Sequence, residues 1–298
     1  MTARALRVAR LSTTIVFASG VLVSAQLLPK EPTHTSGTSV TGAFEGWFTN
    51  PDETKSLLLG YYNRNEKQEL DIPIGPGNHI DPGGPDRGQP THFLTGKQWG
   101  MFVVRVPKDF GKNKITWTLV ANGQTTVIPA GLHPDYEISP LVSSASVVGA
   151  PEEGDTPPVL RFEEKGPSVQ GPLGMIVERT ATMSKPLAVT AWVADDGKLF
   201  TNSGVVPAFL RSRPAVSLRW SKYRGPGTVT FNKDRPEIQK TPCEQKGMTF
   251  CGSATTTVTF GTPGDYTLHV VANDLSGDGG DGFQCCWTTA HVRVSVRP

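Results

Sequence analysis

Short runs of β-type residues, separated by glycine, proline and asparagine turns, constrain this fold more than any other feature. In residues 114–120 apolar and polar side chains alternate, which is the period of a strand with one buried face. Asn122-Gly123 then predicts a two-residue hairpin turn into a second run at 125–128. We find no segment with the apolar spacing of an amphipathic helix. The pattern predicts an all-β chain built from antiparallel sandwiches.

Similar runs recur in two blocks. They lie at 44–48, 56–62, 69–74 and 101–106 in the first block, and at 187–194, 216–220, 227–231, 256–260, 265–272 and 290–296 in the second. Residues 139–184 between the blocks are rich in serine, proline and acidic residues, which is typical of an extended linker, although 159–162 has strand character. We therefore predict two immunoglobulin-like antiparallel β-sandwich domains, 41–138 and 185–298, joined by a linker at 139–184.

The first 40 residues predict export. Three arginines precede a short apolar core, and small residues close to position 25 provide a cleavage site, so residues 1–25 are interpreted as a signal peptide. Residues 26–40 are expected to form a flexible leader. The apolar core is shorter than the ~20 residues of a membrane span, and no later segment is longer, so we predict no transmembrane segment. The expected location is the periplasm, the cell surface or the extracellular space.

The net charge limits the kinds of partner that this chain can bind, and the cysteine content indicates disulfides. The formal net charge is only +2, which argues against a nucleic-acid partner. An even number of cysteines in an exported chain predicts disulfides rather than a zinc site, and the four are Cys243, Cys251, Cys285 and Cys286. Because adjacent cysteines bond each other only with strain, we expect Cys285 and Cys286 each to pair with Cys243 or Cys251.

The second block carries a family resemblance. Trp220 on one run and Tyr266 at the start of a late run are typical of the core Trp and tyrosine corner of immunoglobulin-type sandwiches. Residues 220–231, with 256–260, 263–268 and 272–274, resemble the PKD-like, immunoglobulin-like modules of bacterial exported proteins. The resemblance covers 185–298 and implies a stalk, spacer or adhesive unit without catalytic residues. The first block resembles uncharacterised exported bacterial proteins, which implies no activity.

The long loop at 75–90 is the first candidate site, because nine of its sixteen residues are glycine or proline. His79, Asp81 and Asp86 lie in this loop and His92 lies just beyond it. If these four side chains converged, they could bind a divalent metal or support acid–base chemistry. The alternative, which we favour, is a solvated loop with scattered polar residues.

The segment at 273–282 is the second candidate site. Asp274, Ser276 and Asp278 have the spacing of the first three ligands of a calcium loop, and Asp281 could complete an irregular site. Cys285 stands where an EF-hand needs glutamate, which excludes that motif. Calcium is thus the one candidate cofactor and none is required. The alternative is a mobile loop of glycine and aspartate.

The tip of the second sandwich is the third candidate. The connections at 195–214, 232–253 and 273–287 are expected at one end, where binding loops of such sandwiches cluster. The aromatic residues available there are Phe200, Phe209, Phe283 and Trp287. The alternative is that these loops only cover the open end of the core. His269 and His291 fall on the outward phase of their strands and are expected at the surface.

These observations favour an exported, non-catalytic binding or cell-envelope protein whose ligand is a glycan or an envelope protein. We find no nucleophile elbow, zinc-protease helix, P-loop or Cys-x-x-Cys motif. One alternative is an extracytoplasmic, carbohydrate-active enzyme that uses the 75–92 loop. The other is a purely structural spacer.

Overall fold

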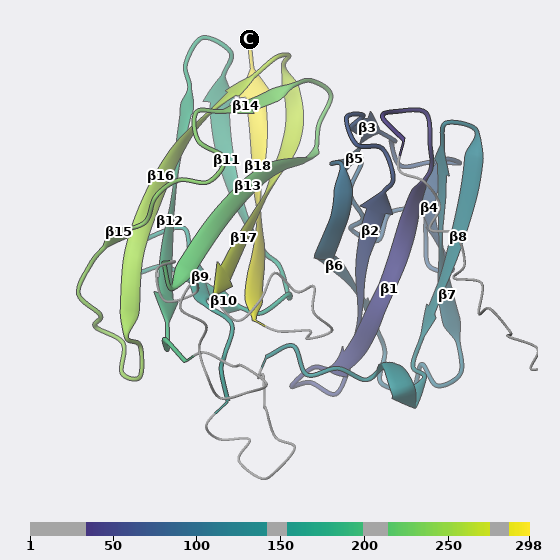
Figure 1. The fold of residues 1–298 in the computed structure, drawn as a ribbon, viewed down its shortest axis with the longest axis horizontal. Helices are drawn as coiled ribbons and strands as arrows, with labels where there is room; N and C mark the ends of the chain where they lie inside the picture. The colour runs from purple at the N-terminus through teal and green to yellow at the C-terminus, as the bar shows by residue number, and fades with distance from the viewer. Residues whose placement is uncertain (1–33, 142–153, 199–213, 275–285) are drawn as a thin grey trace, which may run out of the picture. The chain divides into compact units, whose positions relative to one another are not determined.

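The computed structural model describes residues 34–141, 154–198, 214–274 and 286–298. It confirms the predicted all-β fold of antiparallel sheets, since the only helical element among the described residues is a 3₁₀ turn, η1 (Pro134–Tyr136) (Figure 1). Residues Thr33–Pro298 form one compact unit, so the division into two domains stays a prediction. Among the described residues, no helix has the length and apolar character needed to cross a membrane.

Three sheets form the N-terminal part of this unit. The first contains β1 (Val40–Thr49), β2 (Lys55–Asn63) and β6 (Gly96–Val106); the second contains β4 (Asn78–Asp81), β7 (Lys114–Ala121) and β8 (Gln124–Gly131); the third contains β3 (Leu70–Asp71) and β5 (His92–Phe93). The predicted hairpin turn joins β7 to β8, and its residues Asn122 and Gly123 both have positive φ, at 49° and 76°. This is the backbone that a type I′ hairpin requires.

A hydrophobic core lies between these sheets because alternate residues of each strand point inward. Trp117 of β7 is fully buried, and its ring meets Phe102 edge to face at 5.1 Å between centroids. The indole Nε1 of Trp117 donates a hydrogen bond to Asn78 Oδ1 at 3.0 Å, so burial leaves this donor satisfied. The alternation seen in residues 114–120 therefore marks the central strand of this core.

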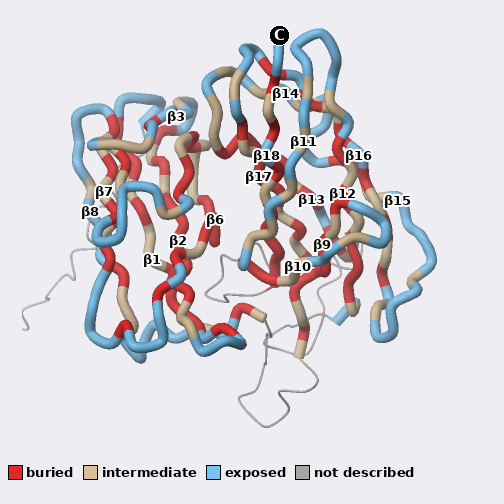
Figure 2. The backbone as a smooth tube through the Cα atoms, turned by 180° about the vertical axis from the view of Figure 1, so that it is seen from behind, coloured by how far each residue is buried: buried red, intermediate tan, exposed pale blue. Residues whose placement is uncertain are grey.

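Two larger sheets enclose a second core. One contains β10 (Ser168–Gln170), β9 (Val159–Arg161), β12 (Leu187–Asp195), β16 (Phe250–Phe260) and β14 (Val229–Phe231), with β15 (Gln239–Lys240) also on β16; the other contains β11 (Met175–Thr182), β18 (Trp287–Arg297), β17 (Gly264–Asp274) and β13 (Val216–Arg224). All pairings are antiparallel except that of β11 with β18. Buried positions follow the strands, and most connecting loops are exposed (Figure 2).

Two aromatic side chains fix this second core as the sequence predicts. Trp220 of β13 is 2% exposed and packs among core residues of both sheets. The Tyr266 hydroxyl donates a hydrogen bond to the backbone oxygen of Thr262 at 2.8 Å. A tyrosine near the start of a late strand that binds the backbone a few residues upstream is a tyrosine corner. The immunoglobulin-type features of the second block are thus present.

Strand β9 (Val159–Arg161) agrees with the strand character expected at 159–162, but the structure corrects the interpretation of the residues from there to 182 as extended linker. Residues 159–182 form β9, β10 and β11, which pair with β12 and β18 rather than spanning open space. Leu160 and Phe162 are buried in the second core. The glycines and prolines that suggested a linker lie in the turns between these short strands. Their pairing partners are distant in sequence, and no local pattern reveals them.

The structure also corrects the predicted disulfide pairing. Cys243 and Cys251 bond to each other, with 5.3 Å between their Cα atoms. The reason is a local hairpin, in which Lys240 of β15 pairs with Gly252 of β16 and brings the two cysteines together. Cys285 lies outside the described residues, and no described cysteine is a free thiol.

Candidate binding site

The outward face of the sheet formed by β13, β17 and β18 provides the candidate site. On β13, Leu218 and Trp220 point into the core, so the alternation places Ser217, Arg219 and Ser221 on the other face. The register aligns these three residues with three outward residues of β17, which are Asn273, Val271 and His269 respectively. Six residues from two neighbouring strands therefore form one continuous patch, which is polar except for Val271.

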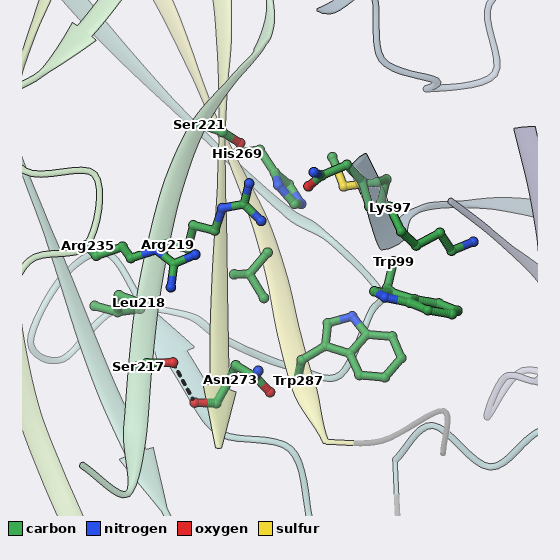
Figure 3. Close-up of a pocket in the computed structure, with 13 residues that line it drawn as sticks. Lys97, Trp99, Ser217, Leu218, Arg219, Ser221, Arg235, His269, Asn273 and Trp287 are labelled. Carbon is green, nitrogen blue, oxygen red and sulfur yellow. Dashed lines mark hydrogen bonds between the residues drawn. The ribbon is translucent and has the colours of Figure 1, made fainter. Parts of the chain in front are cut away.

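Residues of β6 cover this patch and leave a cavity of about 250 Å³ beneath them. Its walls include Lys97 and Trp99 of β6, Arg219 of β13, Arg235 after β14, His269 of β17 and Trp287 of β18. We call this space the Arg219 cavity. Figure 3 shows the Arg235 side chain extending toward Arg219, and the Trp287 indole on the side of Trp99.

The positive charge of Lys97 is balanced within the protein. Its Nζ atom lies 3.0 Å from Oε1 of the buried Glu45 and 4.2 Å above the Trp99 ring. Burial raises the pKa of Glu45, and the nearby Lys97 charge and the Gly100 N–H group oppose this shift. The Glu45 carboxylate thus fixes both Lys97 and the backbone at Gly100, to which it is hydrogen bonded at 2.6 Å.

Arg219 differs from Lys97 because the described residues provide no partner for its charge. Its side chain is half-buried, and within the described part of the chain its guanidinium group forms neither an ion pair nor a hydrogen bond. Arg235 is exposed at the rim and, among the same residues, is equally unpaired. A guanidinium group has five N–H donors, which in proteins usually bind carboxylates, phosphates or carbonyl oxygens.

Two buried polar atoms in the walls also have no hydrogen-bond partner among the described residues. They are Nε2 of His269 and Nε1 of Trp287, whose side chains belong to residues only 1% and 3% exposed. The Trp287 ring packs directly on the Gly100 backbone, where an added Cβ would lie 2.5 Å from the ring. Glycine at this position, which also has a φ of 51°, therefore lets Trp287 enter the wall.

His269 and His291 correct the expectation of two surface histidines. Both lie on the outward phase of their strands, but Tyr223 packs against both rings, and residues of β6 lie across the cavity from His269. The His291 ring lies 4.5 Å from the Tyr223 ring and 5.1 Å from the His269 ring. Burial lowers the pKa of His269 well below its usual value and that of His291 to about 4, with smaller contributions from neighbouring positive charges. Both imidazoles are therefore neutral at pH 7.

The long loop at 75–92 holds β13 in place. Arg224 forms two hydrogen bonds with the Asp86 carboxylate, at 2.8 and 2.9 Å, and donates from Nε to the backbone oxygen of Gln89. These hydrogen bonds are the main reason that the pKa of Asp86 is lowered. The Tyr223 hydroxyl donates to the backbone oxygen of Gly88 at 2.6 Å. The Thr91 N–H group donates to the backbone oxygen of Tyr223. The loop thus supports one wall of the Arg219 cavity.

Of the four polar residues proposed for a site in this loop, two lie beside each other and two bind residues outside the set. His79 lies 3.4 Å from Asp81, and Asp86 binds Arg224. His92 binds Asp71 and Glu69 with its two ring nitrogens, at 2.9 and 3.1 Å. Within the described ranges, the one group of three possible metal-ligating side chains contains none of the four. The four side chains therefore do not converge on one site, as the enzyme alternative requires.

That group of three consists of Asp155, Asp274 and Cys286, whose ligand atoms all lie within 4.8 Å of one another. Calcium takes six to eight oxygen ligands, and this group offers only two carboxylates beside a sulfur. The other predicted calcium ligands, Ser276, Asp278 and Asp281, lie outside the described residues. Calcium binding stays a prediction.

Of the four aromatic residues predicted at the tip of the second sandwich, only Trp287 lies among the described residues. Phe200, Phe209 and Phe283 lie outside the described residues, whereas Trp287 is buried in the wall of the Arg219 cavity. Sequence reasoning did not select Arg219 or Arg235. The strict alternation of residues 216–220 contained a signal for Arg219, since it assigns that side chain to the outward face, but nothing local showed that this face is covered.

Comparison with known proteins identifies no family. No protein-family model matches the chain, and no curated protein matches it. Among solved structures, the chain is similar to the zebrafish RET cadherin-like domains 1 to 4, with 10% sequence identity and a TM-score of 0.25. The match covers 81% of this chain and 47% of that one, so the chain spans about half the length of that structure.

Proposed function

We propose that this chain is an exported, non-catalytic binding protein that holds its ligand in the Arg219 cavity. The observation that carries this proposal is the half-buried Arg219 guanidinium group, which has no partner among the described residues. Placing a charged group in a partly buried position is costly unless another group binds it. A ligand that binds Arg219 would offset that cost.

The walls of the cavity suit recognition. They present N–H and hydroxyl groups, two side-chain amides and two indole rings, which together can orient a polar molecule and pack against its apolar side. A structural spacer has no need for a half-buried guanidinium group that has no partner among the described residues. The Cys243–Cys251 disulfide supports an oxidising location outside the cytoplasm, which agrees with the predicted signal peptide.

A thermal-shift screen of the full chain tests the proposal, with neutral and acidic saccharides and small organic acids as the ligand panel. The test variant is Ser217→Trp, which places a large side chain at the wall of the cavity. The matched control is Ser168→Trp on the exposed position of β10. We expect at least one ligand to raise the melting temperature of the parent and the control but not of Ser217→Trp. If no ligand shows this difference, the cavity is not the binding site.

A further inference from the structure

The charge of the Arg219 cavity is unbalanced. None of its thirteen lining residues, all within the described part of the chain, is acidic, whereas Lys97, Arg219 and Arg235 are basic. Glu45 neutralises Lys97, but no carboxylate lies within ion-pair distance of either arginine among the described residues. Two like charges that share a small cavity repel each other unless a counter-ion lies between them. The cavity is therefore suited to an anion.

The hydrogen-bonding groups point to the same kind of ligand. The Trp287 indole can only donate, and its Nε1 atom is buried without a partner among the described residues. The guanidinium groups of Arg219 and Arg235 are also donors only. A buried donor without an acceptor is costly, so the best ligand carries several acceptor oxygens. A carboxylate satisfies this need and matches the planar guanidinium fork.

The volume of the cavity and its uncharged lining residues limit the size and the chemistry of the rest of the ligand. The cavity of about 250 Å³ is smaller than the roughly 300–1,000 Å³ of pockets for drug-sized molecules. The Ser217 and Ser221 hydroxyl groups and the Gln98 amide can bind alcohol groups. Trp99 and Val271 offer apolar surface for C–H groups. The walls therefore fit one compact, hydroxyl-rich unit.

We infer that the Arg219 cavity binds a compact polyhydroxylated carboxylic acid, of the class that a uronic acid represents, with its carboxylate between Arg219 and Arg235. This inference rests on the proposed function, since it names the ligand class of the same cavity. It assigns to Arg219 the main ionic contact, because Arg219 is the more buried of the two arginines. Arg235 closes the rim over the bound anion.

Isothermal titration calorimetry on the full chain tests the inference with three probes: glucuronate, glucose and inorganic phosphate. Glucose lacks only the carboxylate function, and phosphate is an oxyanion without the sugar. We expect glucuronate to bind at least tenfold more tightly than glucose and more tightly than phosphate. Arg219→Gln should weaken glucuronate binding by about tenfold to a hundredfold, the range for a lost charged hydrogen bond. Arg297→Gln, at the exposed end of β18, is the matched control and should leave the affinity unchanged.

The outcomes separate this inference from the proposed function. Equal binding of glucose and glucuronate, both blocked by Ser217→Trp, would overturn the acidic class and leave the cavity as the binding site. Tighter binding of phosphate than of glucuronate would overturn the carboxylate assignment. The absence of any binding that Ser217→Trp blocks would remove the proposed function itself. If Arg219→Gln does not fold, as judged by its thermal unfolding, the exposed Arg235→Gln replaces it, and unchanged glucuronate affinity in that variant would contradict the inference.

Discussion

Replacing His291 by glutamine should change how the stability of this protein depends on pH. His291 lies on β18 against Tyr223 and His269, and burial is the main reason that its pKa falls from 6.5 to about 4. In the unfolded chain the imidazole has its ordinary pKa and takes up a proton below about pH 6.5. Between pH 6.5 and 4 the unfolded state therefore binds more protons at this position than the folded state. Acid thus favours unfolding across this window.

The magnitude follows from the width of that window. Each pH unit between the two pKa values costs about 1.4 kcal/mol of folding free energy, so from pH 6.5 to pH 5 the parent loses about 2 kcal/mol through His291 alone. Glutamine does not titrate, so the free energy of unfolding of His291→Gln should fall by about 2 kcal/mol less than that of the parent over the same pH range. His269 acts in the same direction as His291. Asp195, whose pKa burial raises to about 7, and Glu45 act in the opposite direction. All three remain in the variant. The effects of Asp195 and Glu45 cancel in the difference, whereas the loss of His291 also removes a smaller electrostatic contribution that lowers the pKa of His269.

The measurement is the free energy of unfolding in urea, at pH 7.5, 6.5, 5.5 and 5.0, for the parent and the variant. His133→Gln, in which the replaced side chain is 64% exposed, controls for the removal of a histidine as such. We expect the difference between the parent and His291→Gln to change steadily below pH 6.5. Parallel stability curves for the parent and His291→Gln would refute the reasoning, because they would mean that His291 takes up its proton equally in both states.

Three further predictions concern single contacts. Tyr266→Phe removes the hydroxyl group that donates to the backbone oxygen of Thr262. It should lower the free energy of unfolding by about 0.5–1.5 kcal/mol, as measured by urea denaturation. Replacing both Cys243 and Cys251 by serine removes a disulfide that closes a short loop, with a sequence separation of 8, and should lower the free energy of unfolding by roughly 2–3 kcal/mol. A thiol assay of the unreduced parent should detect neither cysteine. Trp117→Ala removes the centre of the first core and should cost about 3–5 kcal/mol, which a drop in melting temperature of many degrees would reveal.

Residue patterns with a local cause could be predicted from the sequence. The alternation in residues 114–120, the turn at Asn122-Gly123 and the Tyr266 corner all depend on the chain within a few residues, and the structure contains each of them. Strand character was expected at 159–162, but β10 and β11 were not predicted. The partner of β11 is remote in sequence, as the pairing of Thr182 with Arg297 shows. Long-range pairing sets the structure of β11, and the turn residues around it favoured a linker.

The candidate site shows the same limit. The sequence assigned Arg219 and His269 to outward positions, which is where the strands place them. Whether an outward face meets water or other residues depends on contacts such as Tyr223 with Gly88, which join segments 135 residues apart. The polar side chains of the loop at 75–92 suggested a site, yet three hydrogen bonds from β13 to this loop are accepted by backbone oxygens of the loop. No residue pattern predicts which carbonyl groups will be used.

The parallel pairing of β11 with β18 has a consequence for mechanical load. The two strands are matched from Met175 with Ala290 to Thr182 with Arg297. A tether pulling at the start of β11 and another at the end of β18 would slide the strands lengthwise past each other. In that geometry the hydrogen bonds between them lie across the direction of pull and share the force, so they must break together and cannot open one after another. Under such a load, this edge of the sheet would resist tension better than a pair of strands pulled apart from one end.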